Sequence, residues 1–538
     1  MLHAWIIALF VPVLVHDSLG IGVEPGGGRL HPMLVGWPSA AICMVPMLLL
    51  MAVVHLVSRA VGAEMDQRGE GRAVALMDRA LTATRIGAAI LSAVNILAFG
   101  WLDTVRSVVG DLVIVDELLA ISPALLVYLA GTWSMYPVER RLREAAVMRA
   151  LDTGRTIYPM PSRGQFVLDH ARHQVALSLL PISIILGWGE ALDMGIDWLV
   201  RQVNFLPGEA PHHLPRLVHR LAVLLSDPEV QQLAHFAGQI LGILVVLSFG
   251  PPLLRLIWNT TRLGPGPVRE RLVAMCKQNR VRVRELLIWR THGTTVNGAV
   301  MGLLGWFRYI LLTDALLDSL PEDQVEAVTA HEIAHVRCGH LVWLALVLIA
   351  TIGTAGLVAS LIAYGAERLL GLVLPAEPGE AAATAVAASG VAIELLMTVA
   401  ILAAAMVAFG WVSRRFEWQA DAFAARQMSL LQAPAATSIT PEAANTMVGA
   451  LEAVARLNFV PRRKWGWRHG SIAYRQERLK GLVGLPVGGL PIDRTARRIK
   501  WAAAAALAVV VGASVLAWVY EPGESGSGPS GGARSSAP

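Results

Sequence analysis

The segment His331-Glu332-Ile333-Ala334-His335 holds two histidines four residues apart, with a glutamate directly after the first. On a helix, residues i and i+4 lie one turn apart on the same face, so both imidazoles can reach one zinc ion. Glu332 would lie beside that ion, where it can take a proton from zinc-bound water. The pattern predicts a hydrolytic zinc site. The alternative is a surface helix that carries two histidines by chance.

A catalytic zinc site needs a third protein ligand, and the residues just after the motif do not supply it in a known spacing. Metzincins place a glycine seven residues and a histidine ten residues after the first histidine. Those positions are Cys338 and Leu341 here, which excludes that class. His340 is one position too early and would face away from the two ligands on a continued helix. We expect it to be solvated or to lie behind a ligand.

A better candidate for the third ligand is Glu417, which lies four residues before Asp421. On a helix these two carboxylates share a face. Glu417 can donate an oxygen to zinc, and Asp421 can orient a ligand histidine by accepting its other N–H. In isolation, both residues could be ordinary charges of an amphipathic helix. The upstream H-E-x-x-H favours the metal-site interpretation.

Between His335 and Glu417 lie two long apolar stretches, at about 341–364 and 391–412. Each is long enough to cross a bilayer. Two crossings return the chain to the side that it left. We therefore expect a transmembrane hairpin over about 341–412, with the zinc helix and the Glu417 helix facing the same compartment.

From about Val268 to Leu479 the chain resembles the membrane-embedded gluzincin peptidases, the family that includes the CAAX prenyl protease and the bacterial heat-shock membrane peptidase. The resemblance rests on the H-E-x-x-H at 331–335 and on Glu417-x-x-Ala420-Asp421. It also rests on the run Arg308 to Leu317, which is similar to the family's strand-and-turn approach to the zinc helix.

Two weaker matches extend the resemblance. Asn297-Gly298-Ala299 stands where the family usually has Asn-Ala-Phe, and His469 followed by Arg475 stands where it often has His-Pro and then an arginine. The resemblance implies one zinc ion per chain, held by His331, His335 and Glu417, with Glu332 as general base. It further implies Asp421 behind a ligand, His469 and Arg475 in catalysis, and Asn297, Gly298 and Ala299 in substrate binding.

The composition indicates a membrane protein. Hydrophobic residues make up 55% of the chain and charged residues 16%, with a mean hydropathy of +0.54. Soluble domains average about 25% charged residues. Three scattered cysteines do not form a disulfide framework. We expect about nine spans, centred near Ala8, Leu48, Ala93, Leu126, Ile182, Val245, Ala350, Ala403 and Val510.

The expected fold is mainly α, a polytopic membrane helix bundle with an α+β gluzincin-type zinc peptidase domain. Residues 1–258 would form an N-terminal membrane region of about six spans, and residues 259–482 the peptidase domain, interrupted by the hairpin. A basic linker and the last span would follow at 483–520. The Gly-, Ser- and Pro-rich tail at 521–538 is expected to be disordered.

The distribution of Lys and Arg predicts the orientation. Basic residues crowd the segments 140–163, 262–290 and 462–500, whereas 17–38, 103–117 and 367–380 are poor in them. This alternation places the N-terminus and the zinc site in the cytoplasm, and we expect the membrane to be a bacterial cytoplasmic membrane. The net charge of +5 follows from the basic loops. Because these charges lie beside span ends, anionic lipid headgroups are the expected partner rather than nucleic acid.

The extramembrane part should combine helices and short strands. We predict a helix over Val268–Lys277 and strands over Val281–Trp289 and Tyr309–Thr313. Ser319 and Glu322 are three apart, as in a capping box, and predict the start of a zinc helix that runs to about Cys338. The segment 297–301 is either an edge that pairs with an extended substrate or a glycine-rich connecting loop.

The predicted function is a zinc-dependent integral membrane endopeptidase that hydrolyses membrane-associated or misfolded proteins. An intramembrane protease of the site-2 type would have an apolar zinc helix, but charged residues surround the motif here. A sensor that couples a similar domain to an outer ligand-binding domain would need more than the short polar tail. A catalytically silent scaffold is the other alternative, and the intact Glu332 argues against it.

Overall fold

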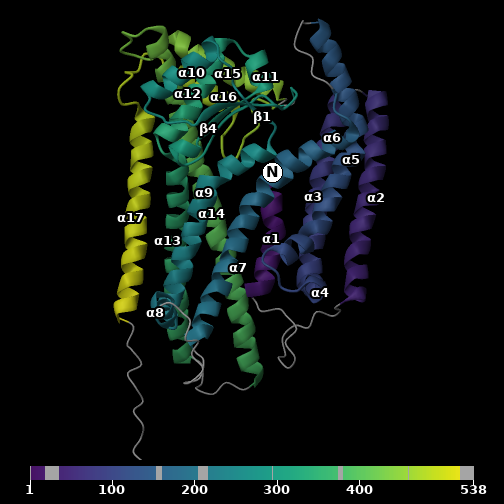
Figure 1. The fold of residues 1–538 in the computed structure, drawn as a ribbon, viewed down its shortest axis with the longest axis vertical. Helices are drawn as coiled ribbons and strands as arrows, with labels where there is room; N and C mark the ends of the chain where they lie inside the picture. Colours follow the sequence, from purple (N-terminus) through teal and green to yellow (C-terminus); the bar gives the residue numbers. More distant parts are fainter. Residues whose placement is uncertain are drawn as a thin grey trace, which may run out of the picture. The chain divides into compact units, whose positions relative to one another are not determined.

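The computed structural model describes residues 2–18, 36–68, 70–152, 160–203, 216–293, 295–373, 380–458 and 460–520 (Figure 1). The predicted disordered tail lies outside these residues. Helices dominate, and a small sheet accompanies them, which confirms the predicted fold class.

The helices are α1 (Leu2–Ser18), α2 (Trp37–Arg68), α3 (Glu70–Phe99), α4 (Trp101–Val109), α5 (Val115–Asp152), α6 (Arg163–His170), α7 (Leu177–Val203), α8 (Arg216–Leu225), α9 (Pro228–Ile257), α10 (Pro267–Gln278), α11 (Asp314–Ser319), α12 (Glu322–Arg337), α13 (His340–Val373), α14 (Glu380–Gln432), α15 (Pro441–Leu457), α16 (Ile472–Lys480) and α17 (Pro491–Tyr520). The strands are β1 (Thr260–Arg262), β2 (Glu285–Trp289), β3 (Gly298–Met301) and β4 (Tyr309–Thr313), with a π-helical turn η1 (Ala171–Ala176) and a 3-10 turn η2 (Gly305–Phe307).

Eight helices in the described part of the chain are long and apolar enough to cross a membrane. Each contains one of the predicted span centres, from Leu48 to Val510. The first predicted span, centred near Ala8, is a shorter apolar helix at Trp5–Asp17. Its inward face is fully buried against α3 and α5, with Ile6 and Leu9 both at 0% exposure. The chain is therefore an integral membrane protein.

The chain folds into two compact units. The first comprises Met1–Arg262, Leu287–Gly293 and Met301–Tyr309, and its core lies among α1, α2, α3 and α5. The second comprises Leu263–Leu286, Thr294–Val300 and Ile310–Pro538. Every residue of the candidate site belongs to this second unit.

The sheet has the strand order β1-β2-β4-β3, with β1 antiparallel to β2 and Thr260 opposite Trp289. The prediction for Tyr309–Thr313 matches β4, and β2 begins at Glu285, later than the predicted Val281. Residues 298–301 form strand β3 at one edge of the sheet rather than a connecting loop. The outer edge of β3, beside the site, is therefore the edge at which an extended substrate could pair.

The zinc-motif helix α12 begins differently from the prediction. Ser319 ends the preceding helix α11, and Pro321 takes the N-cap position of α12 without a side-chain hydrogen bond. The predicted capping box at Ser319 is wrong because extended backbone at Leu320 separates the two helices. At its other end, α12 stops at Arg337, close to the predicted Cys338. Gly339 then adopts a φ of +66°, a left-handed conformation that suits glycine, and turns the chain into α13.

The predicted hairpin is formed by α13 and α14, which run side by side with α17 (Figure 1). Helix α14 continues unbroken for 53 residues, from the apolar arm through Glu417 to Gln432. The second arm of the hairpin and the Glu417 helix are thus one helix. Since it has no break, the position of Glu417 is coupled to the packing of the membrane arm.

The core of the second unit surrounds α12 and α14. Ala330 and Ala334 of α12 and Ala420 and Ala424 of α14 are all at 0% exposure. Small side chains at these positions allow two helices to approach closely. Helices α10, α15 and α16 complete this core, and the close packing of α12 and α14 sets the geometry of the site.

Candidate metal centre

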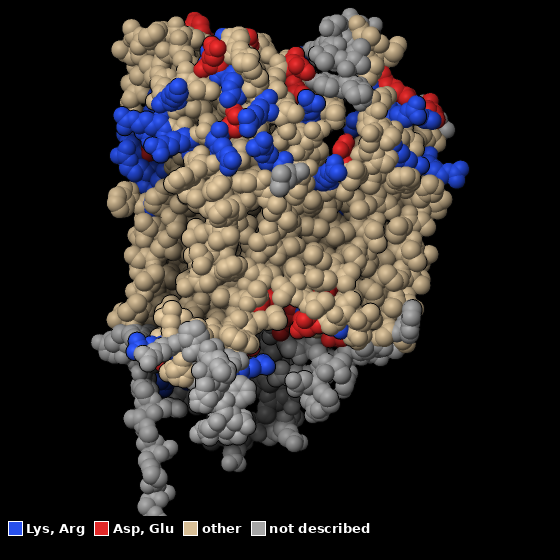
Figure 2. All heavy atoms as spheres, viewed as in Figure 1, with Lys and Arg blue, Asp and Glu red and all other residues tan. Residues whose placement is uncertain are grey.

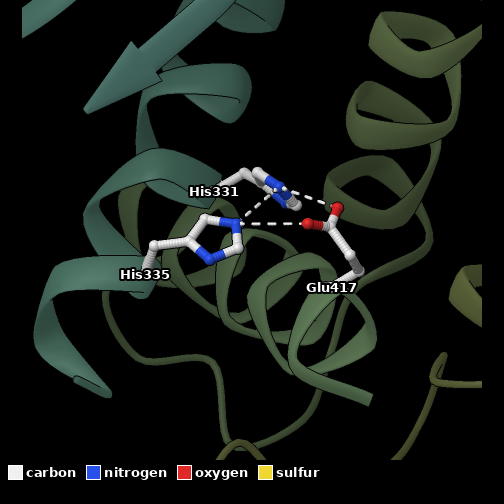
Figure 3. Close-up of side chains that lie close together, drawn as sticks. All are labelled: His331, His335 and Glu417. Carbon is white, nitrogen blue, oxygen red and sulfur yellow. Dashed lines mark hydrogen bonds and ion pairs between the residues drawn. The ribbon is translucent and has the colours of Figure 1, made fainter. Parts of the chain in front are cut away.

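Three side chains from α12 and α14 converge on one point (Figure 3). His331 Nε2 and His335 Nε2 lie 3.2 Å apart. Glu417 Oε2 is 3.6 Å from His331 Nε2, and Glu417 Oε1 is 3.7 Å from His335 Nε2. The i and i+4 spacing on α12 puts both imidazoles on the face that meets α14.

This donor set fits a divalent cation of the zinc type. His331 and Glu417 are buried, and His335 is partly exposed to a pocket. Two imidazoles and one carboxylate, with a fourth direction open, are the ligands of many catalytic zinc sites. The three side chains point their donor atoms at each other, and a shared cation would satisfy all three at once.

The first histidine is oriented from behind by a buried carboxylate. His331 Nδ1 lies 2.9 Å from Asp421 Oδ1, although the approach is not linear enough for an ideal hydrogen bond. Arg475 holds Asp421 in place by donating from Nε to Oδ2 at 2.8 Å and from Nη2 to Oδ1 at 2.6 Å. Burial disfavours the imidazolium of His331, but Asp421 and Glu417 outweigh that effect and raise its pKa in the metal-free chain.

The second histidine is oriented by a chain of three further side chains. His335 Nδ1 lies 2.9 Å from His340 Nδ1, and His340 Nε2 lies 3.0 Å from Gln419 Oε1. Gln419 Nε2 donates to Asp493 Oδ1 at 2.7 Å. His340 is only 1% exposed, so the expectation that it is solvated is wrong, while its place behind a ligand is as expected. The turn at Gly339 accounts for this, because α12 does not continue to His340.

The hydrogen-bond chain has one consistent direction. Asp493 can only accept, so the amide nitrogen of Gln419 faces Asp493 and its oxygen faces His340. His340 then carries its proton on Nε2 and offers Nδ1 as an acceptor. His335 must donate from Nδ1, which leaves the lone pair on its Nε2 facing Glu417. Burial and the neighbouring His331 lower the pKa of His335 to about 3, which keeps this imidazole neutral.

Glu332 lies between the histidines and strand β3. Its Oε2 accepts the backbone N–H of Val300 at 3.2 Å. Desolvation in the pocket and the negative charge of Glu417 raise the pKa of Glu332 to about 7. A carboxyl group with a pKa near neutrality can both accept and release a proton at physiological pH.

A pocket of about 520 Å³ opens over these side chains. Strand β3 forms one wall, with Asn297, Gly298 and Ala299 all in the lining. A Cβ atom on Gly298 would come within 2.9 Å of Val328 Cγ1 on α12, so glycine permits the close approach of strand and helix. Hydrophobic side chains of α13, α14 and α15 form the opposite wall.

His469 reaches the site from the segment before α16. Its Nδ1 lies 3.0 Å from Glu417 Oε1, and its side chain is 54% exposed. Trp467 anchors this segment to α14, where Arg414 Nη1 donates to the Trp467 carbonyl at 2.6 Å. Gly410 makes the contact possible, because a Cβ atom there would lie 2.3 Å from Trp467 Nε1.

The structure brings the residues named from the sequence into one place: Asn297, Gly298, Ala299, His331, Glu332, His335, Glu417, His469 and Arg475 line the pocket, and Asp421 lies behind His331. Sequence reasoning missed Gln419 and Asp493. Gln419 lies two residues after Glu417, on the face toward His340. No signal in the sequence indicates that Asp493, at the start of α17, reaches Gln419 across 74 residues.

Comparison with known proteins locates a family match over this site. Residues 291–460 match the family model described as peptidase family M48, a segment that contains β3, α12, the hairpin and α15. No curated protein matches the chain. Among solved structures, the crystal structure of S. mikatae Ste24p aligns with 13% identity and a TM-score of 0.32, covering 84% of this chain and 100% of that chain. A TM-score this low supports no argument about the fold, so the evidence for the family is the match over residues 291–460.

Proposed function

Because this chain carries a peptidase family M48 domain at residues 291–460 and is a membrane metallopeptidase, we propose that it is a zinc-dependent endopeptidase of membrane-associated or misfolded proteins. The observation that carries the proposal is the convergence of His331, His335 and Glu417 beside Glu332 in one pocket. One zinc ion per chain would be held by those three ligands. When bound there, zinc supplies the Lewis acidity that polarises a scissile carbonyl and activates water.

In this proposal Glu332 moves the proton. Its Oε2 is engaged by Val300, so Oε1 is the oxygen left to receive a proton from the attacking water. The same carboxyl group then returns the proton to the leaving amine. Burial raises the pKa of Glu332 above that of an ordinary carboxylate, which favours the return of the proton to the leaving amine.

The buried partners of the two histidines keep the site in one arrangement. Asp421, fixed by Arg475, orients His331, and the chain through His340 and Gln419 orients His335. Residues of this kind typically change metal affinity 10- to 100-fold when mutated. We assign them the role of positioning residues.

Substrate binding is assigned to strand β3 and the exposed end of the pocket. An extended peptide would add to the edge of β3 by backbone hydrogen bonds along Asn297, Gly298 and Ala299. His469 is half exposed beside Glu417, from where it can donate to the oxyanion that forms on the carbonyl. Arg475 already uses Nε and Nη2 on Asp421, so its contribution to the oxyanion would come from Nη1, 3.5 Å from Glu417 Oε2.

The test of the activity uses purified protein in lipid nanodiscs with casein and an unfolded membrane protein as substrates. Wild type is expected to cleave both, and Glu332→Gln is expected to bind zinc equally but to cleave neither. Arg463→Gln, an exposed change away from the pocket, serves as the control and should cleave as wild type does. Equal cleavage by wild type and Glu332→Gln would refute the proposal. Zinc binding without any cleavage by wild type would favour a scaffold.

We also propose that the site faces the cytoplasm of a bacterial cell, on the basis of the basic segments around it. An Arg463→Cys variant without the three native cysteines tests the side directly, since Arg463 is exposed. A membrane-impermeant maleimide should label it in inside-out vesicles and not in right-side-out ones. The reverse labelling pattern would contradict the orientation.

A further inference from the structure

A second cavity, of about 1210 Å³, lies between the membrane helices α13, α14 and α17. Its walls are almost wholly apolar, with Val347 and Val358 on α13, Ala404 and Val407 on α14 and Ala503 on α17. The cavity is separate from the metal centre. Nothing in the proposed peptide-bond hydrolysis uses it.

The cavity exists because small residues face a space that none of the described helices fills. Helices α13 and α17 meet closely at Gly353, where a Cβ atom would lie 3.0 Å from Val510 Cγ1. On the α14 side four of the nine lining residues are alanines, whose side chains do not reach across. An apolar space offers water too few polar partners to hold it, which favours a hydrocarbon occupant.

One end of the cavity is positively charged. Arg498 of α17 is the charged residue in the lining, and it is exposed. Trp411 of α14 lies at the same end, with the Arg415 guanidinium 3.8 Å over its ring. Arg494 and Arg497 precede Arg498 in the first turns of α17. Within the described residues, no carboxylate forms an ion pair with Arg498.

The surface view agrees with this distribution. Lys and Arg side chains gather on the left of Figure 2, at the level where α17 begins, and the surface along the rest of α17 is uncharged. Such a boundary is typical of a membrane–water interface that meets anionic headgroups. Arg498 therefore lies where a lipid phosphate would be when its chains enter the cavity.

We propose that this cavity, which we call the α17 groove, binds one anionic glycerophospholipid with its acyl chains between the helices and its phosphate at Arg498. On α13 the lining runs from Val347 to Ile362. At 1.5 Å per residue this is about 22 Å, longer than the roughly 15 Å of hydrocarbon in one leaflet. A full-length acyl chain fits along the groove. The charge at its end selects an anionic lipid over a zwitterionic one of the same chain length.

The headgroup part of the proposal is tested by native mass spectrometry of the intact protein with phosphatidylglycerol and phosphatidylcholine of identical chains. Wild type should retain phosphatidylglycerol about fivefold better, and Arg498→Gln should lose that preference. Arg494→Gln is the matched control, a neighbouring exposed arginine that does not line the groove, and should keep the preference. Equal retention of both lipids by wild type would overturn the proposal. Equal losses in the two variants would also overturn it, because they would indicate a diffuse basic surface.

The acyl-chain part is tested by filling the groove. Ala404→Trp, and the smaller Ala404→Leu, should lower phosphatidylglycerol retention in proportion to the added volume. Leu402→Trp places the same ring on α14 outside the lining, at a residue that is 52% exposed, and should have no effect. Retention that is unchanged in both Ala404 variants would show that the lipid binds elsewhere.

Discussion

Replacing His340 with phenylalanine should weaken zinc binding without removing a zinc ligand. The phenyl ring keeps the stacking of His340 on Phe416, whose ring centroid is 4.5 Å away. It removes the acceptor for His335 Nδ1 and the donor to Gln419 Oε1. His335 can then move its proton to Nε2, the nitrogen that faces Glu417, and in that tautomer Nε2 has no lone pair to offer to zinc.

The size of this effect follows from the role of the lost contact. Loss of a partner behind a metal ligand costs about 10- to 100-fold in affinity, or about 1.4–2.7 kcal/mol. The buried Gln419 oxygen left without a donor lowers the free energy of unfolding by about 1–3 kcal/mol as well. Both effects should appear, and the first is specific to the metal.

Competition with a fluorescent zinc chelator measures the affinity, and denaturant titration of the metal-free protein measures the stability. Cys338→Ser is the matched control, because Cys338 lies between the same helices and takes no part in the hydrogen bonds that join His335, His340, Gln419 and Asp493, and its zinc affinity should equal that of wild type. Asp493→Asn should reproduce part of the loss from a distance, since the Gln419 amide could then reverse. A zinc affinity of His340→Phe within twofold of wild type would refute the role of this hydrogen-bond chain.

Three other outcomes follow from the site. Asp421→Asn leaves the buried Arg475 short of a charge partner, so the metal-free protein should lose about 3 kcal/mol of unfolding free energy. The double variant Asp421→Asn/Arg475→Met should regain part of this stability, and additive losses would contradict the pairing of the two residues. Peptidase activity should fall as the pH drops, because protonated Glu332 cannot accept a proton from water. The apparent pKa of this loss should be no higher than about 7, since a bound cation lowers the pKa of Glu332 further. Activity that rises on acidification would be inconsistent with Glu332 as the base. Gly298→Ala should reduce kcat/KM by about tenfold or more with zinc content unchanged, because the added Cβ would push β3 away from α12. Full activity in this variant would argue against substrate pairing at the edge of β3.

The sequence identified His331, His335 and Glu417 as candidate ligands, and the structure brings them together, because much of that pattern depends on local spacing. His331 and His335 share a helix face whatever the rest of the fold does, and Glu417 with Asp421 repeats that geometry. The span centres were also accessible, since a run of apolar residues reports a membrane helix without tertiary information. These features are encoded within one or two helical turns or within one long apolar segment.

The errors arose where tertiary packing or a single backbone angle decides the outcome. The place of His340 behind His335 depends on the left-handed turn at Gly339, because α12 ends at Arg337 and does not continue through His340. Asp493 reaches Gln419 only because α17 packs against the hairpin, and no local pattern records that contact. The continuity of α14 from the membrane to Glu417 likewise needed the assembled fold.

X-ray absorption at the zinc edge of the purified protein would identify the atoms that hold the metal. We expect one zinc per chain with only nitrogen and oxygen neighbours at about 2.0–2.2 Å, two of them imidazole nitrogens, and a loss of zinc in Glu417→Ala. A sulfur neighbour at about 2.3 Å would implicate Cys338 instead. That result, or full zinc content in Glu417→Ala, would contradict the assignment of His331, His335 and Glu417 as the metal ligands.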